Sequence, residues 1–209
     1  MKRMKENPKS FPIFMVFISF MTFMLAVKSF QLPQVRMETP LGNITIVVDA
    51  AHAPITAGNF LKYVNAGLYD GGRFYRVTRP DNYTPAPPNR PMMEIIQGGI
   101  DPSKRSQGFP AIPLERTSVT GLKHVAGTVS MARGGPDTAT SEFFILLDDQ
   151  PSLDFGGKRF DDEQGAAAFG HVTAGLDVVR KIQQQGPMQE QRKDYLVTPV
   201  AITRIAVVK

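Results

Sequence analysis

Four short segments of the chain hold the side chains best suited to act on a substrate. In chain order they are residues 74–77, 97–99, 129–133 and 141–145. The first segment carries Arg76, whose guanidinium stays charged and presents several hydrogen-bond donors in one plane. The last segment carries Phe144, a flat apolar surface on which a ring can rest. The segments therefore combine a fixed donor with an apolar seat, which suits chemistry that needs orientation rather than a nucleophile.

Each of these residues also has an ordinary structural interpretation. An arginine in a strand is most often a solvated residue on the outer face, and Phe143 and Phe144 would ordinarily belong to the core, one on each face of a strand. Gly98 and Gly99 would ordinarily form a turn. The joint order of the four segments, and not any single residue, carries the functional interpretation.

The composition disfavours several other kinds of chemistry. The chain has no cysteine, so thiol chemistry is excluded. Its histidines, His52, His124 and His171, are far apart and share no metal-ligand spacing, so we expect no metal site. No Gly-rich phosphate loop, nucleophile elbow or paired-carboxylate motif is present to suggest a phosphate-binding or hydrolytic enzyme.

Short strands separated by turn residues fill most of the chain after residue 33. Apolar and β-branched runs predict strands at 35–39, 44–48, 74–78, 93–97, 128–132, 143–147, 166–172 and 201–208. Pro54 suits the start and Gly67 the end of one helix, and residues 176–184 predict a second. This pattern indicates an antiparallel sheet that removes its edges by closing, although periodicity alone leaves a β-sandwich open.

Taken together, the four segments resemble the catalytic face of a cyclophilin, a family that catalyses cis/trans isomerisation of the peptide bond preceding proline. The resemblance covers roughly residues 35–208 and follows the strand and helix order of the family. It implies a mainly β fold, a closed antiparallel eight-stranded barrel capped by two α-helices. It also implies that no cofactor is needed and that the substrates are proline-containing peptides and unfolded protein segments.

The resemblance assigns roles to particular residues. It implies that Arg76 is the catalytic arginine and that Gln97 orients it. The positions at which it implies contact with the substrate are Tyr75, Ile95, Ala132, Arg133, Glu142, Phe144 and Leu153. Among these, Phe144 matches the aromatic floor of the proline pocket, and Leu153 matches an aliphatic wall.

Several positions depart from the family pattern. Tyr75, Ser152 and Ala166 stand where the family commonly has histidine, an aromatic residue and histidine, and Glu94 stands where a pocket phenylalanine is expected. Glu142 replaces a glutamine, and its carboxylate can either pair with Arg76 and occupy its donors or orient it in advance. We expect these departures to affect efficiency more than fold.

The N-terminal region predicts a membrane or export signal. Residues 10–27 carry no charge, are almost wholly apolar and follow a basic segment. As a helix they would span about 27 Å, slightly less than the roughly 30 Å hydrocarbon core of a bilayer. We expect an uncleaved membrane anchor with the following domain on the extracytoplasmic, periplasmic side. Secretion after cleavage of the signal is the alternative.

The chain therefore divides into a basic, hydrophobic N-terminus at 1–32 and a cyclophilin-like domain at 33–209. Residues 79–91 hold five prolines and predict a loop where the family has a tight turn, so we interpret them as an insertion beside the active face. The net charge of +5 lies mostly in the N-terminus and no basic stripe follows, so we expect no nucleic-acid partner. We also expect a monomer.

Two functions from different classes remain open on this evidence. The first is a membrane-tethered or exported prolyl isomerase that assists the folding of exported proteins, in which slow proline steps can limit folding. The second is a non-catalytic module that uses a cyclophilin barrel to bind proline-containing segments or to act as a chaperone. Retention of Arg76, Gln97 and Phe144 favours the enzyme.

Overall fold

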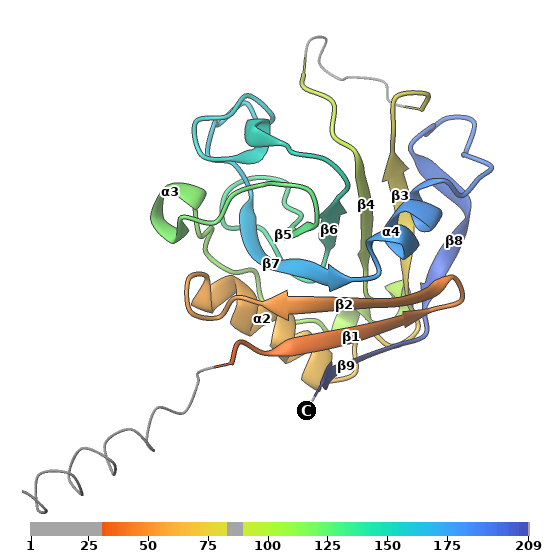
Figure 1. Ribbon diagram of the computed structural model, residues 1–209, viewed down its shortest axis with the longest axis horizontal. Coiled ribbons are helices and arrows are strands. Elements are labelled where there is room, and N and C mark those ends of the chain that lie inside the picture. The colour runs from red at the N-terminus through yellow and green to blue at the C-terminus, as the bar shows by residue number, and fades with distance from the viewer. Residues whose placement is uncertain (1–30, 83–89, 209) are drawn as a thin grey trace, which may run out of the picture. The chain divides into compact units, whose positions relative to one another are not determined.

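The computed structural model describes residues 31–82 and 90–208 (Figure 1). The chain divides into two compact units, Met1–Gln31 and Leu32–Lys209, and the β-rich fold belongs to the second. The predicted membrane segment at 10–27 and the middle of the proline-rich segment, 83–89, lie outside the described residues. Among the residues that are described, no helix is long and apolar enough to cross a membrane.

In the described part of the chain, nine strands form one antiparallel sheet (Figure 1). They are β1 (Gln34–Thr39), β2 (Gly42–Val48), β3 (Gly72–Thr78), β4 (Ile95–Gly99), β5 (Thr128–Met131), β6 (Phe143–Leu146), β7 (Ala167–Ala174), β8 (Tyr195–Ile202) and β9 (Arg204–Val208). Their order across the sheet is β8-β3-β4-β6-β5-β7-β2-β1-β9. Each pair of neighbouring strands is antiparallel. The predicted mainly β, antiparallel fold class is confirmed.

The last two strands close the sheet into a nearly complete barrel. β8 pairs with β3 at one end of the strand order, and β9 pairs with β1 at the other. Only Thr203 separates β8 from β9, so one continuous segment bridges both ends of the sheet. The backbone N–H and the hydroxyl of Thr203 both donate to the Glu38 carbonyl oxygen, at 2.9 and 3.0 Å. Closure of this kind leaves few strand edges open to pairing with other chains.

The predicted number of strands, eight, was too low by one. The closing run was expected at 201–208, whereas the observed run begins at Tyr195 and is divided at Thr203. Pro199 lies inside β8 and lacks a backbone N–H, which weakens the sequence signal for a strand at this point. The run nevertheless forms strands because its first part, β8, pairs with β3 and its second part, β9, pairs with β1.

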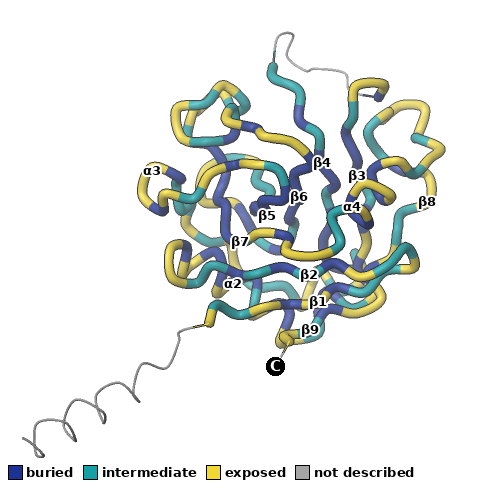
Figure 2. The backbone as a smooth tube through the Cα atoms, in the orientation of Figure 1, coloured by how far each residue is buried: buried dark blue, intermediate teal, exposed yellow. Residues whose placement is uncertain are grey.

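Alternation along the central strands divides their apolar residues between two clusters. In β6, Phe143 and Ile145 belong to the interior of the barrel, whereas Phe144 and Leu146 belong to a smaller cluster on its outer face. Figure 2 shows β5 and β6 coloured as buried, which fits strands covered on both faces. The buried members of the outer cluster are Met93, Ile95, Phe144, Leu146, Leu153 and Ala166.

Two helices pack near opposite ends of β4. The helical elements are α2 (Pro54–Asn65), α3 (Thr117–Thr120) and α4 (Leu176–Gln183), with 3-10 turns η1 (Pro102–Gln107) and η2 (Pro151–Leu153). In α2, Phe60 packs edge-on against Phe143, which pairs near the end of β4. In α4, Gln183 Nε2 donates to the carbonyl of Thr78, which pairs with the first residue of β4. The two predicted helices correspond to α2 and α4, whereas the three short helical turns were not predicted.

Helix α2 also supports the segment that leads into β6. The Glu115 carboxylate accepts from the backbone N–H groups of Ile55 and Thr56, at 3.1 and 2.6 Å, and so satisfies the first turn of the helix. From the same helix, Asn59 Nδ2 donates to the Thr140 carbonyl oxygen at 2.6 Å. The helix therefore fixes the backbone just before β6.

Candidate active site

An irregularity in β3 sets the direction of Arg76. Phe74 pairs with Gly98 and Arg76 pairs with Gln97, so Tyr75 is an extra residue without a partner in β4. The register against β8 shifts at the same place. A β-bulge of this kind re-aims side chains. Phe74 is fully buried in the barrel, whereas the neighbouring Tyr75 and Arg76 are both partly exposed.

Two acceptors hold the Arg76 guanidinium. Its Nε donates to Asp194 Oδ2 at 2.6 Å, and its Nη1 donates to Gln97 Oε1 at 2.9 Å. The Arg76 side chain is only 18% exposed and that of Asp194 is 27% exposed, so the charges are partly shielded from water. Among the described residues, no acceptor lies on Nη2. The guanidinium is thus fixed in one plane with donors left for a substrate.

Gln97 connects Arg76 to a second carboxylate. Its Nε2 donates to the Tyr75 hydroxyl at 2.9 Å, and that hydroxyl donates to Glu142 Oε2 at 2.5 Å. In the part of the chain that the structure describes, no hydrogen bond or ion pair joins Glu142 directly to Arg76. The direct pairing considered from the sequence is therefore replaced by a chain of three hydrogen bonds.

Burial controls the protonation of Tyr75 and Glu142. It raises the pKa of Glu142 above its usual range, while the Tyr75 hydrogen bond and the charges of Arg105 and Arg73 act in the opposite direction. It also raises the pKa of Tyr75, and the nearby Glu142 charge adds to this rise, so the hydroxyl stays protonated. The carboxylate rests against the backbone at Gly99, where a Cβ atom would lie 2.6 Å from it.

A cavity of about 300 Å³ lies beside the Arg76 guanidinium. The predicted site residues that line it are Ile95, Arg76, Gln97, Ala132, Arg133, Phe144 and Leu153. Phe144 and Leu153 are 5% and 0% exposed and form an apolar floor, because they belong to the outer cluster. Tyr75 and Glu142 do not line this cavity and lie at a neighbouring one. The structure therefore places an apolar seat directly beside fixed donors.

Arg133 lines this cavity, but its donors face the protein. Its Nη1 and Nη2 donate to the two carboxylate oxygens of Asp162, each at 2.8 Å, and its Nε donates to the Gly165 carbonyl at 2.7 Å. The guanidinium also lies over the Phe160 ring, 3.9 Å from its centre. With its side chain only 1% exposed, Arg133 shapes the rim by holding residues 160–165 in place.

The residues that depart from the family pattern lie in different parts of the structure. Ala166 is fully buried in the outer cluster, so it adds to the floor without reaching into the cavity. The Ser152 hydroxyl is buried and has no hydrogen-bond partner among the described residues. Glu94 Oε2 accepts from Gln183 Nε2 at 3.1 Å, so this carboxylate faces α4 and not the cavity.

Both ends of the proline-rich segment are tied to the barrel. Arg79 Nη1 donates to the Gln183 carbonyl at the end of α4, at 2.6 Å. Arg90 Nη2 donates to Asp161 Oδ1 at 2.8 Å, and Arg90 also lines the cavity. The end of the segment therefore borders the candidate active site.

Sequence reasoning missed several residues at this site, among them two at the start of the last β-rich run. Asp194 pairs with Arg76 across 118 positions of sequence, and Tyr195 lines the cavity. Neither residue belongs to a recognisable motif. The one available signal was the β-rich run that follows them, since a strand paired with β3 would place its first residues near Arg76.

A serine, a histidine and an aspartate form a hydrogen-bonded row behind Phe144. Asp154 Oδ1 lies 2.8 Å from His124 Nδ1, and Ser130 Oγ lies 3.0 Å from His124 Nε2. The row resembles a hydrolase triad, but Ser130 is 0% exposed and His124 is 1% exposed, so no substrate can reach the serine. His124 instead stacks behind Phe144 with the ring centroids 6.4 Å apart and supports the floor of the cavity.

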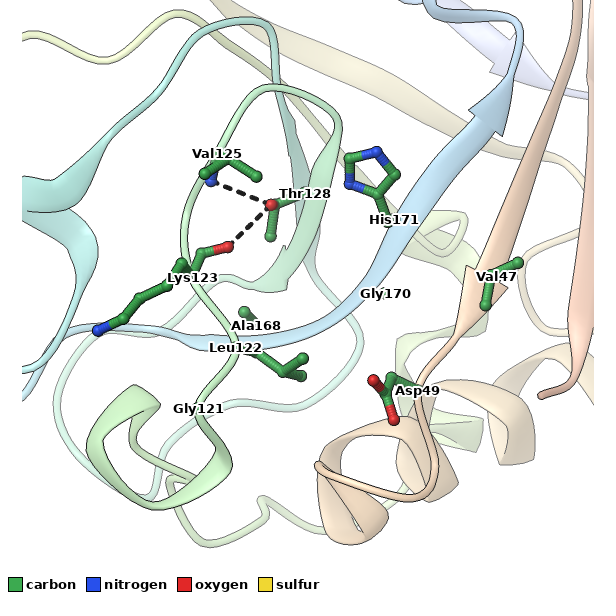
Figure 3. Close-up of a pocket in the computed structure, with 10 residues that line it drawn as sticks. All are labelled: Val47, Asp49, Gly121, Leu122, Lys123, Val125, Thr128, Ala168, Gly170 and His171. Atoms are coloured by element: carbon green, nitrogen blue, oxygen red, sulfur yellow. Dashed lines mark hydrogen bonds between the residues drawn. The ribbon is translucent and has the colours of Figure 1, made fainter. Parts of the chain in front are cut away.

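A further cavity, of about 370 Å³, is lined by other residues (Figure 3). Its ionisable side chains are Asp49, Lys123 and His171, and none of the predicted site residues lines it. Asp49 is already hydrogen-bonded to His52, at 2.9 Å. The Thr128 hydroxyl is satisfied by two backbone groups, as Figure 3 shows. Within the described residues, no group of three or more acidic or histidine side chains could hold a metal ion.

Comparison with protein families identifies the family of this chain. Residues 34–207 match the family described as cyclophilin type peptidyl-prolyl cis-trans isomerase/CLD. The chain belongs to the cyclophilin family. Cyclophilins catalyse isomerisation of Xaa-Pro bonds, so the predicted prolyl isomerase is confirmed.

Several relatives of this cyclophilin carry the same functional name. Peptidyl-prolyl cis-trans isomerase A of Dickeya dadantii is 36% identical over 151 residues, which is 72% of this chain and 70% of the relative. A peptidyl-prolyl cis-trans isomerase of Acinetobacter baylyi is 40% identical over 71% of this chain and 70% of its own length. One from Arabidopsis thaliana is 34% identical over 84% of this chain and 94% of its own length.

The cyclophilin fold is confirmed by solved structures. A crystal structure of a cyclophilin type isomerase from Cryptosporidium parvum matches with a TM-score of 0.64 and 22% identity, covering 85% of this chain and 98% of that one. A second crystal structure of the same protein, in the presence of the dipeptide Ala-Pro, has the same score and covers 84% and 99%. At this identity the likeness concerns the fold alone.

Replacing Asp194 by Asn tests whether this carboxylate fixes Arg76. The change keeps the shape of the side chain but removes the charge-assisted hydrogen bond to Nε, so we expect kcat/KM on an Xaa-Pro peptide to fall about three- to tenfold. Asp177→Asn, which affects an exposed aspartate paired only with Lys181, is the matched control. Unchanged kinetics in Asp194→Asn would show that Gln97 alone holds the guanidinium.

Glu142→Gln tests the cost of burying this carboxylate. Because the pKa of Glu142 is raised in the folded protein, its contribution to stability is present in full below the unfolded pKa and is lost as the pH rises through the folded value. The variant should therefore gain free energy of unfolding relative to the wild type between about pH 4 and pH 8. Urea unfolding at both pH values measures this, with the exposed Glu190→Gln as the control. A difference that is independent of pH would contradict the raised pKa.

Proposed function

We propose that Arg76 and Gln97 form the catalytic pair of this isomerase and that Ile95, Phe144 and Leu153 seat the proline ring of the substrate. One observation carries the proposal. The Arg76 guanidinium is held by two acceptors at the rim of a cavity whose floor is apolar and buried. This arrangement supplies the two things that the reaction requires.

The reaction makes and breaks no covalent bond. Rotation about the Xaa-Pro amide is opposed by a barrier of about 20 kcal/mol, because the nitrogen lone pair is conjugated with the carbonyl. In the twisted transition state that conjugation is lost, and the nitrogen becomes a better hydrogen-bond acceptor. A donor whose hydrogen bond to the twisted state is stronger than its hydrogen bond to the planar state lowers the barrier.

Arg76 can provide such a donor without reorganising. Its Nε and Nη1 are already bonded to Asp194 and Gln97, so the plane of the guanidinium is set before the substrate arrives. We propose that the remaining N–H groups donate to the amide nitrogen of the Xaa-Pro bond of the substrate. Phe144 and Leu153, which are packed into the outer cluster, hold the proline ring while the preceding carbonyl rotates.

The substrates we propose are proline-containing peptides and unfolded protein segments. The similar fold solved with the dipeptide Ala-Pro supports this class of ligand. The chemistry needs no cofactor. We propose no nucleic-acid partner, because the positive charge of the chain lies mostly in its N-terminus. We propose that the chain acts as a monomer.

We further propose that residues 10–27 anchor the chain in a membrane with the cyclophilin domain on the periplasmic side. The support is the absence of charge in this segment and the basic residues that precede it. Proteins folding outside the cytoplasm would then be the clients, and release after cleavage would make the domain a secreted one.

Arg76→Ala tests the catalytic assignment. Without the guanidinium, the transition state loses its fixed donor, and we expect kcat/KM to fall about a hundredfold. Arg76→Lys keeps the charge without the planar fork and should be intermediate. Turnover of a proline peptide by residues 31–209, which include the whole β-rich unit, is the measurement, and peptide affinity is measured alongside.

The exposed Arg36 in β1 provides the matched control, and Arg36→Ala should leave turnover unchanged. Full activity in Arg76→Ala would remove this residue from the mechanism. Peptide binding without turnover by the wild type would favour the non-catalytic module.

The membrane assignment predicts the location of the C-terminus. A reporter enzyme that is active only outside the cytoplasm, fused after residue 209, should be active and should sediment with membranes in a bacterial host. Removing residues 1–30 should abolish its activity, because the only apolar signal is lost. Activity in the soluble periplasmic fraction would show that the signal is cleaved, whereas an inactive full-length fusion would exclude export.

A further inference from the structure

The cavity of about 470 Å³ that Tyr75 and Glu142 line is called the second cavity, and it adjoins the cavity beside Arg76, called the first cavity, across Tyr195. This tyrosine lines both cavities. Tyr75 and Glu142 line the second cavity, and the rings of Tyr75 and Tyr195 lie 5.6 Å apart. The hydrogen-bonded chain that starts at Arg76 therefore leads from one cavity to the other.

Three arginines from separate parts of the chain line this second cavity. Arg73 comes from β3, Arg105 from η1 and Arg192 from the segment before β8, and all three are exposed. Among the described residues, none of the three forms an ion pair. The carboxylate in the lining, Glu142, already accepts from the Tyr75 hydroxyl. Positive charge is thus concentrated here with its donors unoccupied.

The guanidiniums of Arg105 and Arg73 act on the one carboxylate among the described residues that line this cavity, that of Glu142. Burial raises the pKa of Glu142, but the charges of both arginines lower it, so both lie within electrostatic reach of that carboxylate. A second carboxylate brought here by a ligand would meet the same two charges. It would not need to be as deeply buried as Glu142, because the arginines themselves are exposed.

Arg192 stands at the boundary between the two cavities. Its guanidinium carbon lies 3.3 Å above the centre of the Tyr195 ring. Stacking of this kind uses the face of the guanidinium and leaves the N–H groups at its edge able to bind a carboxylate. A cation is therefore held next to the one aromatic residue that a peptide would cross between the cavities.

We propose that the second cavity binds an acidic side chain of the substrate, so that this isomerase prefers proline segments with Asp or Glu within a few residues of the proline. The proposal rests on the proposed function of Arg76. An extended peptide advances about 3.3 Å per residue, so a segment seated in the first cavity reaches the adjoining one after a short stretch. The fork of N–H donors on arginine matches a carboxylate in geometry and charge.

Peptide kinetics with the full chain in detergent test the preference. Peptides with one proline carry Glu, Gln or Lys at each of the three positions before and after it. At low salt we expect one or more Glu peptides to have a KM about three- to tenfold lower than the matching Gln peptides, and this advantage should shrink at high salt. Arg105→Gln should reduce the advantage, and Arg105→Glu should turn it into a preference for Lys.

Arg36→Gln changes the net charge equally but lies on β1, so it should keep the Glu preference. Equal KM values for Glu and Gln peptides in the wild type would overturn the proposal, as would a preference that survives Arg105→Glu. A loss of preference in Arg36→Gln would also overturn it by showing an effect of net charge alone.

The neutral Gln peptides separate this proposal from the proposed function. If they are not turned over, the assignment of catalysis fails, and the affinities of the same peptides, measured by fluorescence anisotropy, still test the acidic preference. If they are turned over and no Glu preference exists, the catalytic assignment stands and the second cavity has no role in selecting the substrate.

Discussion

Pairing of the last segment of the chain with both ends of the sheet is the constraint on which the site depends. β8 lies against β3 with Tyr195 opposite Arg76, and this register brings Asp194 to the guanidinium. The same segment continues as β9 beside β1, so β8 cannot slide along β3 without breaking the closure at Thr203. The direction of the Arg76 guanidinium is therefore a consequence of barrel closure.

The two carboxylates closest to the donor act in different ways. Asp194 bonds directly to Arg76 and holds its plane. Glu142 is reached only through Gln97 and Tyr75, because the bulge in β3 places the tyrosine hydroxyl between them. A second direct ion pair would have occupied more of the Arg76 N–H groups. Because Gln97 and Tyr75 intervene instead, Nη2 keeps no acceptor among the described residues and lies beside the first cavity.

Isomerisation requires a rigid binding site more than it requires reactive groups. The floor of the cavity is rigid because Phe144 is packed on the outer face of a strand that is also buried on its inner face. The hydrogen-bonded row of Ser130, His124 and Asp154, of which the first two are buried, supports it from behind. The arginines around Tyr195 lie outside this centre and line a separate cavity.

The sequence by itself determined the fold class, the reaction and most of the residues around the first cavity, because strand alternation, turn residues and the four motifs are local properties of the chain. It did not determine that Asp194 holds Arg76, nor that Tyr75 separates Arg76 from Glu142. The run containing Pro199 was also predicted too short, since this proline lacks the backbone N–H that a strand donates and so interrupts the local strand pattern. These features depend on register, on one bulged residue and on closure of the barrel. Only the tertiary structure decided them, because the packing of all strands together determines which side chains meet.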